Sequence, residues 1–318
     1  MKKILEEVRG AKSIAISGHI RPDGDCVGSC MGLYLYLTKE LPDAIVDVFL
    51  ETPSDVFCCI QNVNAIKDAK QYQDALYDVF VAIDCSKDRL GDAEVIFDNA
   101  GKTINIDHHI SNDGCGDVNY LRADASSASE LVYELLDEAK LDTEIAKALY
   151  IGIIHDTGVL QYSNTAPATL VAVSELVKFG FDFPKLIEET FYEKTFAQNQ
   201  IMGRALLESV LYLDGRCIAS VVTKETMNFY GVTGKELDGI INQMRNTKGV
   251  ECAIFLYELD ELEYKVSMRS GGQVNVSVIA QYFGGGGHVR AAGCTVKGNA
   301  QDIIRDICEQ IKQQYACE

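Results

Sequence analysis

The sequence predicts an α/β fold whose first half is an open parallel β-sheet with helices on both faces. Short runs of apolar residues alternate with helical patterns as far as about residue 154, and this alternation is typical of βαβ units. Two of the runs are apolar almost throughout and end in an aspartate, at Asp84 and Asp107. Parallel strands covered on both faces have this composition, and ligands bind beyond their carboxyl ends.

The individual elements of the first half follow from the spacing of the apolar residues. Four segments are predicted as strands: residues 13–17, 44–50, 79–84 and 103–107. Three segments are predicted as helices: residues 26–39, 126–139 and 143–154. The serines that open the second helix and Asp142 before the third are suitable N-caps, because their side-chain oxygens can accept hydrogen bonds from free backbone N–H groups.

The pattern changes after residue 184. A mixed-charge helical stretch comes first, and a smaller α+β region follows it. Its predicted strands are residues 206–213, 217–223, 251–259 and 264–269, and its predicted helices are residues 234–245 and 300–313. The expected organisation is a first domain over residues 1–184, a helical linker over residues 185–208 and a second domain over residues 209–318. Two domains are also what a chain of 318 residues favours.

The composition indicates a cytoplasmic protein that handles small molecules. The formal net charge is −18, from 29 basic and 47 acidic residues. Long DNA or RNA is bound by broad basic surfaces, so this balance argues against such a partner but not against a small phosphorylated one. No apolar stretch approaches the ~18–20 residues of a membrane span, and the N-terminus lacks a signal-peptide pattern. The eleven cysteines form no Cys-x-x-Cys pair, which is typical of reduced thiols.

The loop after the first strand contains three side chains that can bind a metal ion. His19, Asp23 and Asp25 form a His-x-x-x-Asp-x-Asp block. Pro22 and Gly24 favour a tight turn, so that the two carboxylates can point to different ions. The simpler alternative is a turn in which an aspartate caps the following helix. Taken alone, the block leaves both interpretations open.

Further candidates follow two later strands and one helix. Asp84 ends its strand, which is common for an acid without any function. Asp107 is followed by His108 and His109, and an imidazole can bind a metal ion while an adjacent acid orients it. Asp156 precedes Thr-Gly near the end of a predicted helix, where the alternative is an ordinary helix terminus with a glycine cap.

The second domain contains a run of four glycines followed by charged residues. Glycine-rich backbone can turn its N–H groups towards an anion, and nearby histidine and arginine add charge. The alternative is a flexible hairpin or linker. The apolar sequence on both sides of the run argues against a linker. The candidate anion-binding residues are Gly284, Gly285, Gly286, Gly287, His288 and Arg290, with Arg269 and Ser270 as weaker candidates at a strand end.

These blocks, in this order, resemble the DHH phosphoesterase superfamily. All five histidines of the chain lie in or beside one of the blocks. The glycine run followed by Ala-Ala-Gly resembles the C-terminal DHHA1 domain of that superfamily. The resemblance spans residue 13 to about residue 297. The compact layout is most similar to the branch of small oligoribonucleases and 3′-phosphoadenosine-5′-phosphate phosphatases, the nanoRNase type.

The resemblance implies a centre of two manganese ions. Asp84 would bridge both ions, Asp107 would orient His108, and His109 would face the scissile phosphate, so that Asp84, Asp107 and His109 are the expected catalytic residues. His155 departs from the residue expected before Asp-Thr-Gly, and it receives no role. The implied metal ligands are His19, Asp23, Asp25, Asp84, His108 and Asp156. The implied contacts to the terminal phosphate or base are Arg269, Ser270, Gly284, Gly285, Gly286, Gly287, His288 and Arg290.

The expected activity is a manganese-dependent hydrolysis, strictly dependent on bound metal, of short oligoribonucleotides and linear dinucleotides such as pApA to mononucleotides, and of 3′-phosphoadenosine-5′-phosphate to AMP. Three alternatives stay open: a cyclic di-AMP phosphodiesterase, an inorganic pyrophosphatase or exopolyphosphatase of the same superfamily, and a nucleotide sensor without activity. The expected partners are a small nucleotide or short RNA, without long nucleic acid or membrane, and the resemblance also suggests a homodimer.

Overall fold

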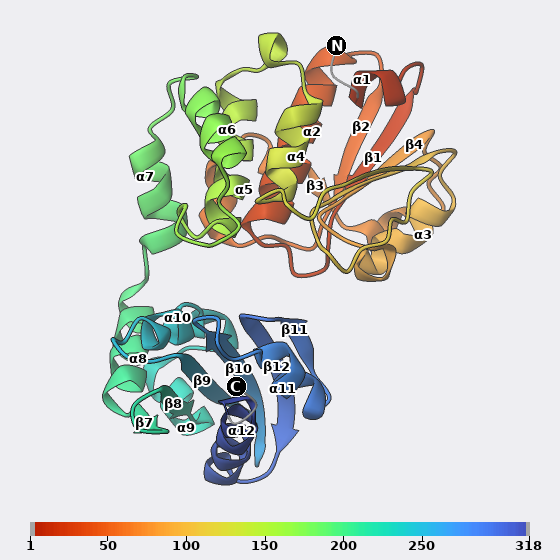
Figure 1. Ribbon diagram of the computed structural model, residues 1–318. Helices are drawn as coiled ribbons and strands as arrows, with labels where there is room; N and C mark the ends of the chain where they lie inside the picture. The colour runs from red at the N-terminus through yellow and green to blue at the C-terminus, as the bar shows by residue number, and fades with distance from the viewer. Residues whose placement is uncertain (1–3, 316–318) are drawn as a thin grey trace. The chain divides into compact units, whose positions relative to one another are not determined.

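The chain folds into two compact units. A computed structural model describes residues 4–315, and the boundary between the units falls between Glu193 and Lys194 (Figure 1). This boundary lies inside the helical linker expected over residues 185–208. The expectation of one continuous helix there was wrong. Helix α7 (Phe183–Ile187) passes into a π-helical turn over Glu188–Tyr192, the backbone then becomes extended, and Thr195 caps a new helix, α8 (Phe196–Leu207).

The first unit is built on a six-stranded parallel sheet with the order β3-β2-β1-β4-β5-β6. All five pairs of neighbouring strands are parallel, which confirms the α/β prediction. Two short strands, β3 and β6, were not predicted, because neither has a long apolar run. The strands are β1 (Ser13–Ser17), β2 (Ile45–Phe49), β3 (Ile66–Lys67), β4 (Val79–Ile83), β5 (Thr103–Asp107) and β6 (Val118–Leu121).

Helices of the first unit pack on this sheet and on one another (Figure 1). The two longest, α2 and α5, lie against each other and, together with α4, form much of the largest hydrophobic core. Helix α6 was not anticipated from the sequence. The helices are α1 (Ile4–Glu7), α2 (Gly24–Glu40), α3 (Glu94–Asp98), α4 (Ala128–Leu135), α5 (Thr143–Asp156), α6 (Pro167–Val177) and α7.

Glycine permits the close approach of α2 to α5. A Cβ atom on Gly28 of α2 would lie 2.6 Å from the carbonyl oxygen of Ala148 and 2.7 Å from the backbone nitrogen of Gly152, both in α5. Backbone atoms in a packed helix pair cannot move aside easily. The first turn of α2 also contains Asp25. The close contact of α2 with α5 therefore fixes the position of the Asp25 carboxylate relative to α5.

We therefore expect Gly28→Ala to destabilise the first unit by about 1–3 kcal/mol, the usual cost of inserting a methyl group into a filled core. Gly203→Ala is the matched control, because Gly203 lies in α8 and a Cβ there would meet no atom within 4 Å. The control should leave stability unchanged or raise it, since alanine favours helix. Urea denaturation measures both variants. Equal stability of Gly28→Ala and the wild type would contradict the packing described.

The second unit contains a mixed six-stranded sheet with the order β11-β12-β10-β9-β8-β7. Only β8 and β9 pair in parallel, and the remaining pairs are antiparallel, as in the predicted α+β domain. The strand expected over residues 206–213 is shorter, because α8 continues to Leu207. The strands are β7 (Val210–Tyr212), β8 (Cys217–Val222), β9 (Cys252–Asp260), β10 (Glu263–Ser270), β11 (Gly286–His288) and β12 (Ala291–Lys297).

Four further helices complete the second unit. Helix α12 packs its apolar face on the sheet through a row of isoleucines spaced at helical intervals. The helices are α9 (Lys224–Tyr230), α10 (Ile240–Arg245), α11 (Val276–Tyr282) and α12 (Ala300–Tyr315). Among residues 4–315, no helix has the length and apolar character required to span a membrane.

Candidate metal centre

Several segments of the first unit bring acidic and histidine side chains to the carboxyl ends of the central strands. His19 follows β1, Asp84 follows β4 directly, and Asp107 is the last residue of β5. Asp25 lies in the first turn of α2, and Asp156 is the last residue of α5. The strand order changes direction between β1 and β4. The side chains therefore meet at the switch point of the sheet, where ligands of open α/β sheets bind.

The Asp84 carboxylate lies between two imidazoles. Its Oδ2 is 3.4 Å from Nε2 of His19, and its Oδ1 is 3.4 Å from Nε2 of His108. On the far side of His19, the Oδ1 of Asp23 is 3.7 Å from the same Nε2, and on the far side of His108, the Oδ2 of Asp156 is 3.7 Å from its Nε2. The predicted ligands thus form two groups that share Asp84.

Asp25 completes the second group from a fully buried position. Its Oδ2 is 4.0 Å from Nε2 of His108, and its two oxygens accept hydrogen bonds from the backbone nitrogens of Ala128 (2.6 Å) and Ser129 (2.9 Å) at the start of α4. Burial raises the pKa of Asp25 well above its usual range, and the nearby charges of Asp84 and Asp156 raise it further. A cation at this position would relieve that repulsion.

Asp23 has two uses in the structure. Its Oδ1 accepts hydrogen bonds from the backbone nitrogens of Asp25 and Cys26, each at 3.1 Å, so it is the N-cap of α2. The same oxygen faces His19. The two interpretations of the His-x-x-x-Asp-x-Asp block are therefore compatible, because a carboxylate oxygen has more than one lone pair.

The residues fit a divalent metal ion. The Oδ1 of Asp84 is buried and has no hydrogen-bond partner within residues 4–315, while the Nε2 of His108 lies 3.4 Å from it. A metal cation bound here would compensate this buried carboxylate oxygen. Asp84 also adopts a left-handed backbone conformation, with φ of 61°, which is uncommon for a non-glycine residue, although aspartate adopts it more readily than most. Carboxylate and imidazole donors together suit manganese, magnesium or zinc rather than a strictly thiophilic metal.

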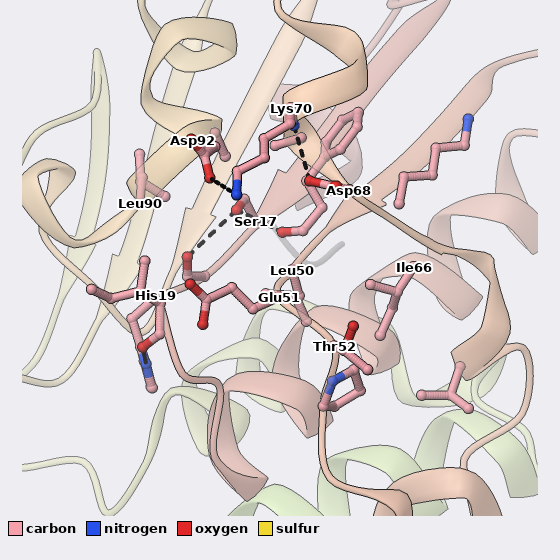
Figure 2. A pocket seen from close by; sticks show the side chains of 18 of the residues that line it. Ser17, His19, Leu50, Glu51, Thr52, Ile66, Asp68, Lys70, Leu90 and Asp92 are labelled. Carbon is pink, nitrogen blue, oxygen red and sulfur yellow. Dashed lines mark hydrogen bonds and ion pairs between the residues drawn. The ribbon is translucent and has the colours of Figure 1, made fainter. Parts of the chain in front are cut away.

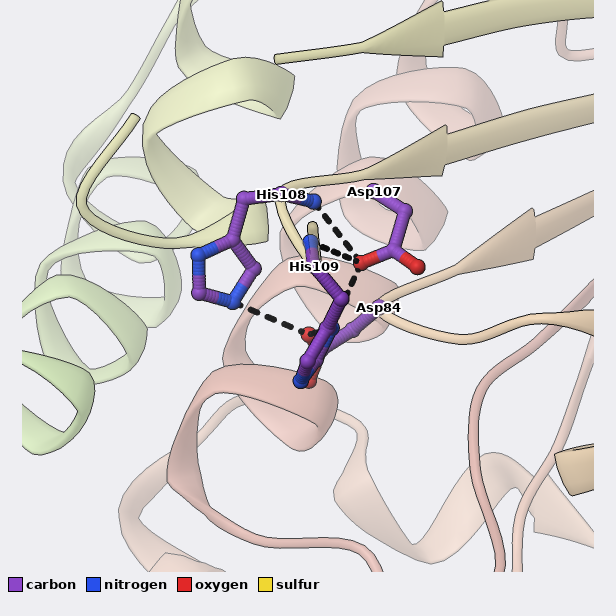
Figure 3. Close-up of side chains that lie close together, drawn as sticks. All are labelled: Asp84, Asp107, His108 and His109. Carbon is purple, nitrogen blue, oxygen red and sulfur yellow. Dashed lines mark hydrogen bonds and ion pairs between the residues drawn. The ribbon is translucent and has the colours of Figure 1, made fainter. Parts of the chain in front are cut away.

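Asp107 is placed as predicted, but it orients a different imidazole. Its Oδ1 accepts hydrogen bonds from the ring Nδ1 of His109 (2.7 Å) and from the backbone nitrogens of His108 (2.7 Å) and His109 (3.1 Å) (Figure 3). Asp107 was expected to orient His108, and it contacts His108 at the backbone nitrogen rather than at the ring. The ring of His108 instead points its Nε2 at Asp84, and Asp107 fixes His108 only through its main chain.

Three asparagines that sequence reasoning did not select support this arrangement. The side-chain nitrogen of Asn112 is 2.5 Å from the Oδ2 of Asp107 and 3.0 Å from the Oδ1 of Asn105, which is fully buried in β5. Asn164 donates to the Oδ2 of Asp156 at 3.2 Å. The position of Asn112 five residues after Asp107 was the available signal, because asparagine near a strand end often bonds local backbone or acids.

The imidazoles of the metal-free centre hold their protons tightly. Burial lowers the pKa of His19, but hydrogen bonds to Asp23 and Asp84 outweigh it and raise the pKa to about 11. Burial likewise opposes charge on His108, while Asp84, Asp25 and Asp156 raise its pKa to about 10. Both rings are thus protonated at pH 7 without metal. A metal ligand must be a neutral imidazole, so binding of an ion has to displace these protons.

We expect manganese binding to release protons at pH 7, and the apparent affinity to rise with pH between pH 6 and pH 8. The sign follows from the raised pKa values, because the metal-free state binds protons that the loaded state cannot keep. Calorimetric titrations at pH 7 in two buffers of different ionisation enthalpy count the released protons. Binding without proton release, at an affinity independent of pH between 6 and 8, would show that the imidazoles are not ligands.

A cavity opens beside His19 within the same unit. Its volume is about 600 Å³, which lies in the range of small-molecule sites. The walls come from the carboxyl ends of β1 and β2 and from the segments after β3 and β4, and they carry acids, lysines and hydroxyl groups (Figure 2). Residues on these walls include Ser17, His19, Leu50, Glu51, Thr52, Ile66, Asp68, Lys70, Leu90 and Asp92.

The predicted substrate residues gather in the second unit. Arg269 of β10 pairs with Ala291 of β12, which in turn pairs with His288 of β11. Gly286 and Gly287 therefore lie in a hairpin, the arrangement that the sequence left open as the alternative to an anion-binding loop. The hydroxyl of Ser270 is buried and donates to the carbonyl oxygen of Val274. The residues in this group are Arg269, Ser270, Gly284, Gly285, Gly286, Gly287, His288 and Arg290.

Helix α11 holds this hairpin in place. The backbone nitrogen of Val276 donates to the carbonyl oxygen of Val289 at 2.9 Å, and the hydroxyl of Ser277 donates to the carbonyl oxygen of Gly287 at 2.8 Å. Gly287 has φ of 143°, and a Cβ there would collide with backbone atoms of β12. The glycine at this position is therefore required by the close approach of the two strands.

An α/β unit with an acidic, histidine-containing centre at its switch point, followed by a mixed-sheet unit, is the architecture of a metal-dependent hydrolase. The family comparisons agree with this class. Residues 13–153 match the DHH family, N-terminal domain, and residues 214–314 match the DHHA1 domain. The chain belongs to the DHH family, with a DHHA1 domain after its catalytic domain, as the sequence blocks predicted.

Curated relatives match the chain over almost its full length. The bifunctional oligoribonuclease and PAP phosphatase NrnA of Bacillus subtilis is 29% identical over 93% of this chain and 93% of its own length. The probable enzyme of the same name from Streptococcus mutans is 30% identical over 98% of this chain and 97% of its own length. Among solved structures, an exopolyphosphatase-related protein from Bacteroides fragilis superposes with a TM-score of 0.89 at 25% identity, covering 97% of this chain and 94% of that chain.

Proposed function

We propose that this chain is a metal-dependent phosphoesterase that hydrolyses short oligoribonucleotides and linear dinucleotides such as pApA to mononucleotides, and 3′-phosphoadenosine-5′-phosphate to AMP. The observation that carries the proposal is the Asp84 carboxylate, whose two oxygens face His19 and His108 separately. The names of the full-length relatives support the choice of substrate.

The proposed cofactor is a pair of Mn²⁺ ions. The ligands would be His19 and Asp23 for one ion, Asp25, His108 and Asp156 for the other, and Asp84 for both. The four carboxylates of this set carry a formal charge of −4, which two divalent ions would balance. When bound, such a pair lowers the pKa of a water molecule and neutralises charge on the phosphoryl oxygens.

His109 is the proposed residue that faces the scissile phosphate. Its Nδ1 is fixed by the carboxylate of Asp107 at 2.7 Å, so the proton on that nitrogen is held in place and the ring orientation is set. The other ring nitrogen is then the atom that can exchange a proton with a reacting oxygen or stabilise its charge. Asp107 acts through His109 and through the main chain of His108, and Asp84 acts through the metal ions.

Selection of short substrates is assigned to the second unit. Arg269, His288 and Arg290 would supply positive charge to a terminal phosphate, with the glycine hairpin between them and Ser270 at the end of β10. Arginine and histidine bind phosphate through charge-assisted hydrogen bonds. A site that binds the terminal phosphate of its substrate would favour substrates of a few nucleotides.

The net charge of −18 supports the same substrate class, because a long polynucleotide is repelled by an acidic surface. The cavity beside His19 offers space for a nucleoside next to the centre. Location in the cytoplasm, assembly as a homodimer and the absence of membrane or long nucleic acid partners stay predictions from the sequence.

A substrate panel tests the proposal. Product formation is followed on 3′-phosphoadenosine-5′-phosphate, pApA, a five-nucleotide RNA, a 24-nucleotide RNA, cyclic di-AMP and pyrophosphate, each with Mn²⁺, with Mg²⁺ and without metal. We expect rapid release of AMP from the first two substrates, slower cleavage of the short RNA and little cleavage of the long RNA. Faster turnover of cyclic di-AMP or pyrophosphate than of pApA would identify one of the alternative enzymes, and binding of pApA without any product would identify a sensor.

A further inference from the structure

His155 occupies a position between the metal centre and the connection to the second unit. It directly precedes Asp156 at the end of α5. Its ring makes edge contacts with Phe57, at 5.1 Å between ring centroids, and with Phe191, at 5.4 Å. Neither Asp156 nor any other proposed ligand requires an imidazole at this position, so the reason for a histidine must lie in its other contacts.

The base of the His155 side chain lies against the first metal-binding loop. A Cβ atom on Gly24 would collide with Cγ and Cβ of His155, so the imidazole occupies the space that a side chain on Gly24 would need. Gly24 is the residue between Asp23 and Asp25. The position of the ring therefore limits where the backbone between these two carboxylates can lie.

The Nε2 end of the ring contacts the connector, the segment after α7 that joins the two units and begins with the π-helical turn Glu188–Tyr192. The Nε2 atom of His155 is 3.1 Å from the hydroxyl oxygen of Thr190. That hydroxyl donates its single hydrogen to the carbonyl oxygen of Leu186 at 2.7 Å, so it must accept from His155, whose Nε2 carries the proton. Thr190 is buried in the π-helical turn Glu188–Tyr192, immediately before the boundary of the first unit.

We propose that His155 is a positioning residue that ties the root of the interdomain connector to the Asp23-Gly24-Asp25 loop. The π-helical turn presents the Thr190 hydroxyl inward, Thr190 fixes the ring of His155, and the ring fixes Gly24. The inference rests on the metal centre of the proposed function. It adds that the way the connector leaves the first unit affects how tightly that centre binds metal.

Three substitutions test the inference by manganese binding, measured by calorimetry. Thr190→Val keeps the side-chain shape but removes the acceptor, and His155→Phe keeps an aromatic ring but removes the donor. Each should weaken manganese binding about tenfold, the usual effect of losing a partner that orients metal ligands. The double variant should be no weaker than either single variant, because both remove one interaction. His155→Gln places an amide N–H at similar reach and should recover most of the affinity.

Thr143→Val is the matched control. It removes one hydroxyl that donates to the carbonyl oxygen of Phe179 at the opposite end of α5, and it should leave manganese affinity unchanged. Wild-type affinity in both Thr190→Val and His155→Phe would overturn the inference. Recovery by phenylalanine but not by glutamine would overturn it as well, because the ring would then only fill space. Binding is measured without substrate, so a chain that binds manganese but hydrolyses nothing would contradict the proposed function and leave this test valid.

Discussion

Replacing Asp84 with asparagine should reduce turnover of pApA about a thousandfold, the loss that corresponds to roughly 4 kcal/mol of transition-state stabilisation. The substitution keeps the shape of the side chain, but one of the two oxygens that face His19 and His108 becomes an amide nitrogen that cannot bind a cation. The variant should also bind fewer manganese ions per chain than the wild type, because the proposed shared ligand is lost. Both effects are measured on the same preparation, by product release and by metal analysis.

Asp78→Asn is the control for this experiment. Asp78 directly precedes β4, the strand that Asp84 follows, and its Oδ2 accepts hydrogen bonds from the backbone nitrogens of Lys12 and Ser13. It has the same charge but lies at the amino end of the sheet. We expect wild-type turnover from this variant. Comparable activity of Asp84→Asn and Asp78→Asn would show that the chemistry takes place elsewhere.

The second large effect is expected from Asp107→Asn. The buried carboxylate accepts hydrogen bonds from the ring of His109 and from Asn112, and although burial acts to raise the pKa of Asp107, these bonds hold it below its usual range. An asparagine cannot keep the proton of His109 on Nδ1 in the same way. The value of kcat should fall about 10²–10⁴-fold, the contribution typical of a positioned acid or base, while KM changes little.

Steady-state kinetics on pApA separates these two parameters. Asp117→Asn serves for comparison, because Asp117 accepts hydrogen bonds from the backbone and hydroxyl of Thr103 at the opposite end of β5. That variant should retain wild-type kcat and KM. A rise in KM at constant kcat for Asp107→Asn would instead assign Asp107 to substrate binding.

Much of the centre could be predicted from the sequence because of the regular geometry of parallel strands. Apolar runs that end in Asp84 and Asp107 must place those side chains at one edge of the sheet, whatever the remaining fold. The His-x-x-x-Asp-x-Asp block follows another such run, so His19 arrives at the same edge. These placements depend on local pattern and on the parallel arrangement alone.

The contacts that refine the centre could not be predicted, because they join segments that the sequence does not relate. Asn164 reaches Asp156 from a loop, and Thr190 reaches His155 from a turn that was expected to be ordinary α-helix. The choice of His109 rather than His108 as the ring partner of Asp107 depends on rotamers within a tight turn. Each of these contacts is set by tertiary packing, which overrides the local preferences that sequence patterns report.

The end of the first unit gives a second example. The mixed-charge stretch after Pro184 contains no further proline, which favours one long helix over residues 185–208, yet the helix stops near Glu193 and a new helix begins after Thr195. The capping box of Thr195 and Gln198 was visible in the sequence as a possible start. The buried contact of Thr190 with His155, just before that start, joins two segments that sequence patterns do not relate.

Return of metal to a chelated chain tests the central claim most directly. The protein is treated with a chelator, manganese is titrated back, and AMP release from pApA is measured alongside the number of bound ions. The account predicts no turnover in the chelated chain and full turnover once two ions are bound per chain. Full turnover without bound metal, or binding of two ions with no hydrolysis of pApA, would contradict the assignment of this cluster as the catalytic centre of a phosphoesterase.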